Sequence, residues 1–310
     1  MTAQADVKRQ VQEFYDQVGW QEIYDGSDGQ IHYQNARYED LRPVSHEYIH
    51  RCHLRVARHL NPSGRFLLDA GSGPIQYPEY LQYSKGYQRR VCADISILAL
   101  QEARKRIGPH GLFVVADIAN LPFKPDVFDG VVSLHTIHHL PEDEHLEAYR
   151  ELHRVLASGS TGVVVNGWPD SRLMSFFDPL IRLSIRLRGI ARRITQKGNP
   201  PTQKKHRERA AGKTQPESGD PKGTFTNRHD VAWIQNEVGG LMPVEILVWR
   251  SVSVRFLRNL IYPALGGRLW LRLLFWLEEK YPHYFGENGQ YPLIVIQKRG
   301  LRPIHRTNPE

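Results

Sequence analysis

The stretch from Arg65 to Gly73 (RFLLDAGSG) constrains the fold of this chain more than any other. Three apolar residues lead to an acid, Asp69, which is followed at once by a Gly-x-Gly sequence. A short apolar run is typical of a buried parallel strand, and glycines directly after it let the backbone approach a ligand closely. We therefore expect a strand that ends in a ligand-binding turn.

Two further strand-like runs also end in an acid. Residues 91–94 end at Asp94, and residues 112–117 end at Asp117. Because the carboxyl ends of parallel strands meet at one edge of a sheet, the three carboxylates would face one ligand, as in a nucleoside-binding site. A nicotinamide dinucleotide site is the nearest alternative, but its fingerprint requires a third glycine where this chain has Gln76.

The order of the elements predicts an α/β fold with a Rossmann-like, doubly wound and mostly parallel seven-stranded sheet. Strands are expected near 65–69, 89–93, 111–116, 127–133, 161–166, 244–249 and 292–296. Helices are expected near 5–18, 44–60, 77–84, 96–107, 142–156, 170–194, 228–237 and 255–282. We expect a helical cap (1–60), a core (61–167), an amphipathic helix with a basic, disordered insertion (168–227), and a final part of the core (228–300) with a helical insertion at 255–289, before a tail.

The basic character of the chain is local. The formal net charge is +8, but residues 182–213 contain eleven Lys or Arg against the single acid Glu208. That segment therefore carries +10, and the remainder sums to about −2. A phosphate-binding arm for nucleic acid is one interpretation of this segment, and a helix lying on an anionic membrane surface is another.

The two cysteines, Cys52 and Cys92, lie in segments that we expect to be buried, and no spaced cysteine framework or metal site is indicated. No run reaches the roughly 18 apolar residues of a membrane span. These features favour a cytoplasmic protein. Residues 170–194 also suggest peripheral contact with the inner membrane surface.

The motifs of the core resemble those of class I S-adenosylmethionine-dependent methyltransferases, closest to the small-molecule branch that includes the ubiquinone and menaquinone enzymes (methyltransferase type 11). The segments that carry the resemblance are Leu68–Gly73, Cys92–Asp94, Ala116–Phe123, Phe128–His135, His138–Pro141 and Leu152–Leu156. The resemblance implies that the cofactor is S-adenosylmethionine and that the protein is an enzyme.

The resemblance also implies roles for particular residues. The turn Gly71-Ser72-Gly73 would approach the methionyl part of the cofactor, and Asp69 would act through its ammonium group. Asp94 would accept from the ribose hydroxyls, and Ile95 would pack on the adenine. The other expected contacts are Asp117 and Ile118 with the adenine edge and His135 with the methionyl end.

One departure from the family pattern follows the second glycine. The family commonly has a small or polar residue there, and often a further glycine, whereas this chain has Pro74, which lacks a backbone N–H and stiffens the turn. The contacts to the methionine part are therefore left open.

A hydroxyl or acidic-carbon acceptor needs a base. His138 is the candidate, ahead of His139, and the alternative for both is helix capping or packing. Tyr15 and Tyr24 either close over the cofactor or pack.

The insertions at 167–227 and 255–289 both leave from the ligand edge of the sheet, so we expect them to form a lid and an acceptor pocket. Their apolar side chains favour a small lipophilic, isoprenoid-like acceptor methylated at O or C; packing of these helices on one another is the alternative. Two other functions remain open, a nucleic-acid methyltransferase and a non-catalytic cofactor-binding protein. Against the first, residues 133–136 (SLHT) lack the motif of exocyclic-amine enzymes.

Overall fold

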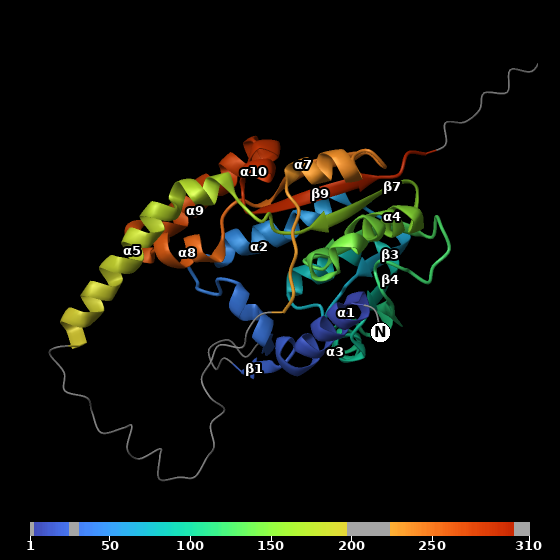
Figure 1. The fold of residues 1–310 in the computed structure, drawn as a ribbon, viewed down its shortest axis with the longest axis horizontal. Helices are drawn as coiled ribbons and strands as arrows, with labels where there is room; N and C mark the ends of the chain where they lie inside the picture. The colour runs from blue at the N-terminus through green and yellow to red at the C-terminus, as the bar shows by residue number, and fades with distance from the viewer. Residues whose placement is uncertain (1–2, 25–30, 197–223, 301–310) are drawn as a thin grey trace, which may run out of the picture.

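The computed structural model describes residues 3–24, 31–196 and 224–300. A seven-stranded sheet forms the centre, in the order β5-β4-β3-β6-β7-β9-β8, and only β9 runs antiparallel to its neighbours (Figure 1). This confirms the predicted fold class. The strands are β3 (Gly64–Ala70), β4 (Tyr87–Asp94), β5 (Gly111–Val115), β6 (Phe128–Leu134), β7 (Leu156–Val165), β8 (Val244–Arg250) and β9 (Tyr291–Gln297).

Helices cover both faces of the sheet. One apolar cluster joins the sheet to α4 (His145–Val155), α7 (Val231–Trp233) and η9 (Ile234–Val238). The other joins it to α3 (Ile97–Ile107), η3 (Val56–His59) and η4 (Pro78–Ser84). Short 3-10 turns, η5 (Gly108–His110), η6 (Ile137–His139) and η7 (Glu142–Glu144), connect these elements. The alternating strands and helices of the sequence therefore produce the doubly wound core.

A third apolar cluster lies beyond the β8 side of the sheet. It packs α2 (His46–Leu54) against α5 (Arg172–Gln196), α8 (Val254–Leu260) and α9 (Gly267–Lys280), with α10 (Pro282–Asn288) following. Ile181 and Phe177 of α5 belong to this cluster, whereas Phe176 and Leu183 of the same helix are 76% and 51% exposed. The predicted packing of these helices on one another is thus present, and a second apolar face of α5 remains uncovered.

Two of the expected helices have a different form. The helix expected at 255–282 is interrupted by η10 (Pro263–Leu265), where Pro263 cannot continue a helix and Gly266 adopts a φ of 71°. The helix expected at 77–84 is the 3-10 helix η4, whose start at Pro78 follows a residue in extended conformation. The α-helix that we expected at 77–84 is therefore replaced by a 3-10 helix.

The N-terminal segment forms α1 (Ala3–Phe14), η1 (Tyr15–Gly19), a small hairpin and η2 (Gln34–Tyr38). The hairpin strands β1 (Glu22–Tyr24) and β2 (Ile31–Tyr33) were not predicted. The basic insertion, which we expected to be disordered, lies almost entirely outside the described residues, as do the tail and the Tyr24 side chain. Cys52 and Cys92 are both buried and free, and within the described residues no helix is long and apolar enough to cross a membrane.

Glu278 of α9 is a buried carboxylate that joins the third cluster to the sheet. It is fully buried and accepts hydrogen bonds from the Tyr48 hydroxyl (2.7 Å), the Ser251 N–H (2.9 Å) and Arg55 (2.9 Å). Because removing one partner of a buried pair leaves the other charge uncompensated, Glu278→Ala should lower the free energy of unfolding by about 3–5 kcal/mol.

Urea denaturation measures this loss. The neighbouring Glu279 provides the control, since it is 37% exposed at its side chain and also pairs with Arg55, so Glu279→Ala should cost about 1 kcal/mol or less. Equal losses of unfolding free energy in the two variants would contradict the role of Glu278 as a buried, stabilising carboxylate.

Candidate active site

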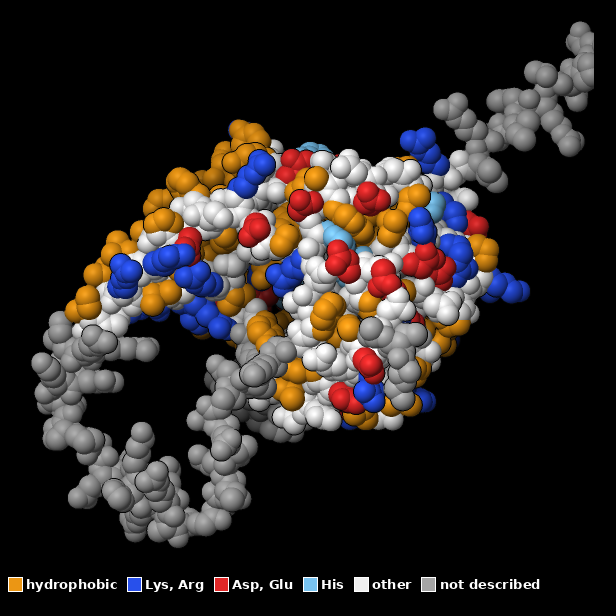
Figure 2. All heavy atoms as spheres, viewed as in Figure 1, with side chains coloured by type: hydrophobic (Ala, Val, Ile, Leu, Met, Phe, Trp, Pro, Cys, Tyr) orange, Lys and Arg blue, Asp and Glu red, His pale blue; other side chains and the backbone are white. Residues whose placement is uncertain are grey.

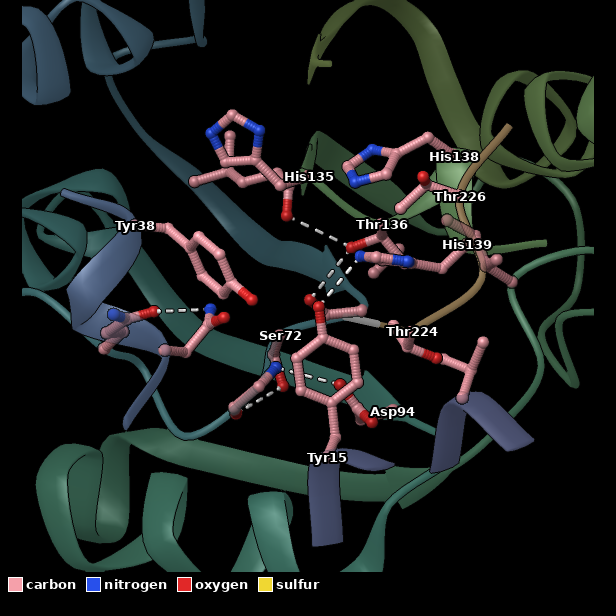
Figure 3. Close-up of a pocket in the computed structure, with 18 of the residues that line it drawn as sticks. Tyr15, Tyr38, Ser72, Asp94, His135, Thr136, His138, His139, Thr224 and Thr226 are labelled. Atoms are coloured by element: carbon pink, nitrogen blue, oxygen red, sulfur yellow. Dashed lines mark hydrogen bonds between the residues drawn. The ribbon is translucent and has the colours of Figure 1, made fainter. Parts of the chain in front are cut away.

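One cavity of about 650 Å³ opens at the carboxyl edge of the sheet, beneath α1 and η1. Figure 3 shows part of its wall, with side chains from the N-terminal segment facing those that follow β3, β4 and β6. The nine residues predicted to bind the cofactor and the predicted base line this cavity: Asp69, Gly71, Ser72, Gly73, Asp94, Ile95, Asp117, Ile118, His135 and His138. Their roles toward a ligand stay predictions, but the structure brings them together.

The glycine turn is closely packed. Gly71 and Gly73 have φ values of 73° and 54°, which side chains rarely adopt. A Cβ on Gly71 would lie 2.2 Å from the Thr136 side chain, whose hydroxyl donates to the Gly71 carbonyl oxygen (3.2 Å). A Cβ on Gly73 would lie 3.1 Å from the Trp20 ring. Both positions therefore exclude a side chain, which fits a turn shaped for close approach to a ligand.

Asp94 is held by the same turn. Its carboxylate accepts from the Gly73 N–H (2.9 Å) and from the Ser96 N–H (2.9 Å) at the start of α3. Burial raises the pKa of Asp94 to about 6, although these two N–H groups oppose the rise. The Asp94 side chain is thus fixed in position and titrates close to the working range of most enzymes.

This pKa gives a pH prediction for cofactor binding. Because the pKa is raised to about 6, Asp94 is ionised above that pH and gains a proton below it. If Asp94 binds the ribose hydroxyls, as the sequence resemblance implies, the protonated form would accept fewer hydrogen bonds from them. Calorimetry with S-adenosylhomocysteine should therefore show constant affinity from pH 7 to 8 and a loss approaching tenfold per pH unit below 6.

Asp94→Asn should remove that pH dependence while weakening binding at pH 7.5. A wild-type profile in the variant would count against this role for Asp94.

The other two strand-end acids are already paired. Asp69 is buried and accepts from Nε (3.1 Å) and Nη2 of Arg90, whose side chain is fully buried. Asp117 forms an ion pair with Lys8 of α1, and its second oxygen accepts from the Ala119 N–H (3.0 Å). Sequence analysis gave no sign of either cation, since Arg90 lies in a strand and Lys8 lies more than one hundred positions away.

Further polar contacts fasten α1 and η1 to the sheet edge. Gln12 donates to the Ile95 carbonyl oxygen (3.0 Å), and the Ser96 hydroxyl donates to Asp16. Together with the Lys8–Asp117 pair they place the N-terminal segment across the cavity.

Three histidines follow β6 in the wall of the cavity. His135 has a φ of 56°, an uncommon conformation for a residue with a side chain. Burial lowers the pKa of His135 to about 3, that of His138 well below its usual value, and that of His139 to about 4. All three rings are therefore neutral near pH 7, and each has one ring nitrogen without a hydrogen that can accept a hydrogen bond.

Tyr15 and His139 point toward one another across the cavity (Figure 3). The His139 Nδ1 lies 2.7 Å from the Phe225 carbonyl oxygen, which only accepts, so Nδ1 carries the hydrogen. The Nε2 atom is then the acceptor, and the Tyr15 hydroxyl donates to it at 2.8 Å. Burial raises the pKa of Tyr15, which keeps that hydroxyl protonated. Sequence reasoning placed neither residue in such a pair.

His138 has a different partner. Its Nδ1 lies 3.2 Å from the Asn166 side-chain oxygen, and its backbone oxygen accepts from the Asn227 N–H (2.8 Å). His138 also lines the cavity, and with Nδ1 donating to Asn166 its Nε2 is the nitrogen that can accept a hydrogen bond.

Comparison with known proteins finds a similarity in the core of the chain. Residues 68–164, about a third of the chain, match a family model described as a methyltransferase domain. These residues contain all the motifs from β3 to β7. A search of curated proteins finds no match.

Several solved structures are similar to this chain. The 4+2 cyclase SpnF has 17% sequence identity and a TM-score of 0.49, with 95% of this chain and 97% of that chain covered. A putative methyltransferase in complex with the Haloferax volcanii Trm112 activator has 16% identity and a TM-score of 0.48, covering 83% and 92%. Phosphoethanolamine N-methyltransferase 2 of Haemonchus contortus, in complex with S-adenosylmethionine, has 15% identity and a TM-score of 0.45, covering 80% and 52%.

Proposed function

We propose that this protein is an S-adenosylmethionine-dependent methyltransferase, and that it methylates an oxygen or carbon atom of a small lipophilic acceptor by in-line transfer. Its residues 68–164 match the model of a methyltransferase domain. The observation that supports this most is a single cavity with two chemically different ends. The glycine turn and the strand-end acids line one end, and Trp249 and Tyr291 line the other. Such a cavity admits a nucleoside and a second molecule together, and aligning the two is the main task in methyl transfer.

The residues at the first end fit the cofactor. Gly71 and Gly73 leave room for its methionyl part, Asp94 accepts from its ribose, and Ile95, Asp117 and Ile118 surround its adenine. Asp69 acts through the oxygen that Arg90 does not bind, and His135 lines the methionyl end. When bound, the cofactor supplies a methyl group on a sulfonium, whose C–S bond breaks with its electron pair remaining on sulfur.

A hydroxyl or acidic-carbon acceptor must lose a proton as it gains the methyl group. We propose that His139 takes this proton at Nε2. Either the Tyr15 hydroxyl receives the proton from the acceptor while donating its own to Nε2, or the acceptor replaces Tyr15 as the partner of Nε2. His138 is the other candidate. Positioned general bases of this kind contribute about 10²–10⁴-fold to rate.

Labelled-methyl transfer to separated lipid, metabolite and RNA extracts tests the proposed function. We expect label in the metabolite or lipid fraction. Label in RNA would support the nucleic-acid alternative, in which residues 182–213 bind phosphates. Measurable affinity for S-adenosylhomocysteine without transfer to any extract would support the non-catalytic alternative.

The uncovered face of α5 supports peripheral contact with an anionic membrane. Figure 2 shows hydrophobic side chains along the outer edge of this region and Lys and Arg side chains beside them. The exposed apolar residues of this face are Phe176, Leu180, Leu183, Leu187 and Ile190. A helix with these two kinds of side chain is suited to the interface of an anionic bilayer, where an isoprenoid-like acceptor would be found.

Flotation with phosphatidylglycerol-containing vesicles at physiological salt tests this contact. We expect the wild-type protein to float and the double variant Phe176→Asp, Leu183→Asp to stay at the bottom of the gradient. Absence of the wild-type protein from the vesicle fraction would contradict the proposal, and vesicles of neutral lipid provide the control.

A further inference from the structure

The end of the cavity beyond His135 is rich in arginine. Four arginines line the cavity away from the strand-end aspartates, namely Arg228, Arg250, Arg255 and Arg258, against the one carboxylate of Glu39. Figure 2 shows Lys and Arg side chains on both sides of the hollow between the α5 region and the body of the molecule. An excess of cationic groups around an enclosed space attracts an anion.

Arg250 is the buried member of this group. It is 2% exposed and forms an ion pair with Glu39, yet its Nε–H has no hydrogen-bond partner among the described residues. The indole N–H of the adjacent Trp249, also 2% exposed, lacks a partner as well. A buried donor without an acceptor is costly, and such groups in native structures usually have a function.

Arg228 approaches the same place from the chain segment before α7. Within residues 3–24, 31–196 and 224–300 its guanidinium has neither a hydrogen bond nor an ion pair. A Cβ built on Gly167 would lie 3.4 Å both from the Arg228 Cζ and from the Tyr291 ring. The Arg250 Cζ lies 4.7 Å from the centre of that ring, so the two guanidinium groups adjoin Tyr291.

The position of this arginine pair separates it from the ribose site. Arg250 ends β8, which is five strand positions from β4, where Asp94 lies. At ordinary strand spacing this is about 24 Å along the sheet. His135 stands between the two ends, with its ring 5.0 Å from that of Trp249 and 5.8 Å from that of Tyr291. The pair therefore belongs to the acceptor end.

We propose that the acceptor carries an anionic group, a carboxylate or a phosphate, which Arg228 and Arg250 bind next to Tyr291. Guanidinium groups match the geometry of both anions, and their charge-assisted hydrogen bonds are strong where water is excluded. Arg255 and Arg258 of α8 add positive charge; Arg255 also pairs with Asp178 (2.9 Å), and Arg258 also donates to the Glu39 backbone oxygen (2.6 Å). This inference rests on the proposed function and specifies its substrate: a molecule with an apolar body and an acidic group.

Calorimetry of the full-length protein saturated with S-adenosylhomocysteine tests the site, with inorganic phosphate and acetate as separate probes. We expect at least one probe to bind, and Arg228→Gln to weaken that binding at least tenfold. Arg250→Lys keeps a charge beside Glu39 but removes the Nε–H, and should weaken it about threefold or more. Arg182→Gln is the control, because Arg182 is exposed on α5 and pairs with Asp178 outside the cavity.

The results separate this site from others. If neither probe binds, or if both bind the Arg228→Gln variant as tightly as wild type, the proposal is wrong. If Arg228→Gln instead weakens S-adenosylhomocysteine tenfold and leaves the probes unaffected, the arginines serve the carboxylate of the cofactor, and the proposal is also wrong.

Fractionation of acceptors gives the second test. A metabolite and lipid extract is separated on an anion exchanger before labelled-methyl transfer, and we expect acceptor activity only in the retained, acidic fraction. Loss of acceptor activity after phosphatase treatment would identify the anionic group as a phosphate, and retained activity would identify it as a carboxylate. Activity confined to the neutral fraction would overturn the anionic acceptor while leaving methyl transfer intact. If no fraction accepts label, the proposed function fails, and the calorimetric result still decides whether the anion site exists.

Discussion

Replacing Gly71 with alanine is expected to weaken the binding of S-adenosylhomocysteine at least 100-fold. The new Cβ would lie 2.2 Å from the Thr136 side chain, and the residue would have to keep a φ of 73°. The left-handed conformation alone costs about 1–2 kcal/mol. Thr136 is branched and cannot simply turn away, because its hydroxyl is bonded to the Gly71 carbonyl oxygen. The turn must therefore shift, and with it the N–H of Gly73 that holds Asp94.

Gly159→Ala is the matched control for this effect. Gly159 has a φ of 81°, but a Cβ there would meet nothing within 4 Å. This variant carries the backbone strain without the clash, so it should lose stability and keep its cofactor affinity. Calorimetry measures both affinities, and thermal unfolding reports whether each variant is folded at the assay temperature. Wild-type affinity in a folded Gly71→Ala variant would contradict the assignment of the turn.

Replacing His139 with alanine should lower kcat by about 10²-fold, the lower end of the contribution of a positioned base, because its lowered pKa makes His139 a weak base. The Nε2 atom is the acceptor of the Tyr15 hydroxyl, and the Phe225 carbonyl oxygen fixes this tautomer. Tyr15→Phe keeps the ring that stacks on Trp20 but removes the hydroxyl, so it should lower kcat by a smaller factor. Affinity for S-adenosylhomocysteine should change little in either variant.

The same assay distinguishes His139 from His138. His138→Ala should lower kcat less than His139→Ala does. Only His139 has its Nδ1 bonded to a carbonyl oxygen and its Nε2 bonded to a hydroxyl that could pass a proton to it. The reverse order would make His138 the base. The wild-type rate should also be independent of this group between pH 5 and 8, since the pKa of His139 is lowered to about 4 and the ring is neutral throughout that range.

The core of this fold could be predicted from sequence because its signals are local. The strands β3 and β4 each contain a short apolar run, and each run is followed by an acid, Asp69 or Asp94. The hairpin β1–β2 was missed because strands of three residues are too short to show an alternating pattern. We predicted one continuous helix at 255–282 because we gave its apolar periodicity more weight than the helix-breaking residues Pro263 and Gly266.

The site could be predicted only where its residues are close in sequence to those strands. The pairing of Tyr15 with His139 joins positions 124 apart, and that of Arg250 with Glu39 joins positions 211 apart. Such contacts arise from how the N-terminal segment lies across the sheet edge, and no local pattern encodes them. For the same reason Arg90 and Lys8, the partners of Asp69 and Asp117, were not anticipated.

The way α1 and η1 are fastened over the cavity has a kinetic consequence. The links from Lys8, Gln12 and Asp16 hold the N-terminal segment against the sheet edge, and we expect them to open when a spent cofactor molecule leaves beneath that segment. Each turnover would then include an opening and a closing of this segment, and we expect product release, rather than methyl transfer itself, to limit the rate. Substitutions that remove those contacts would then speed product release and weaken the binding of S-adenosylmethionine.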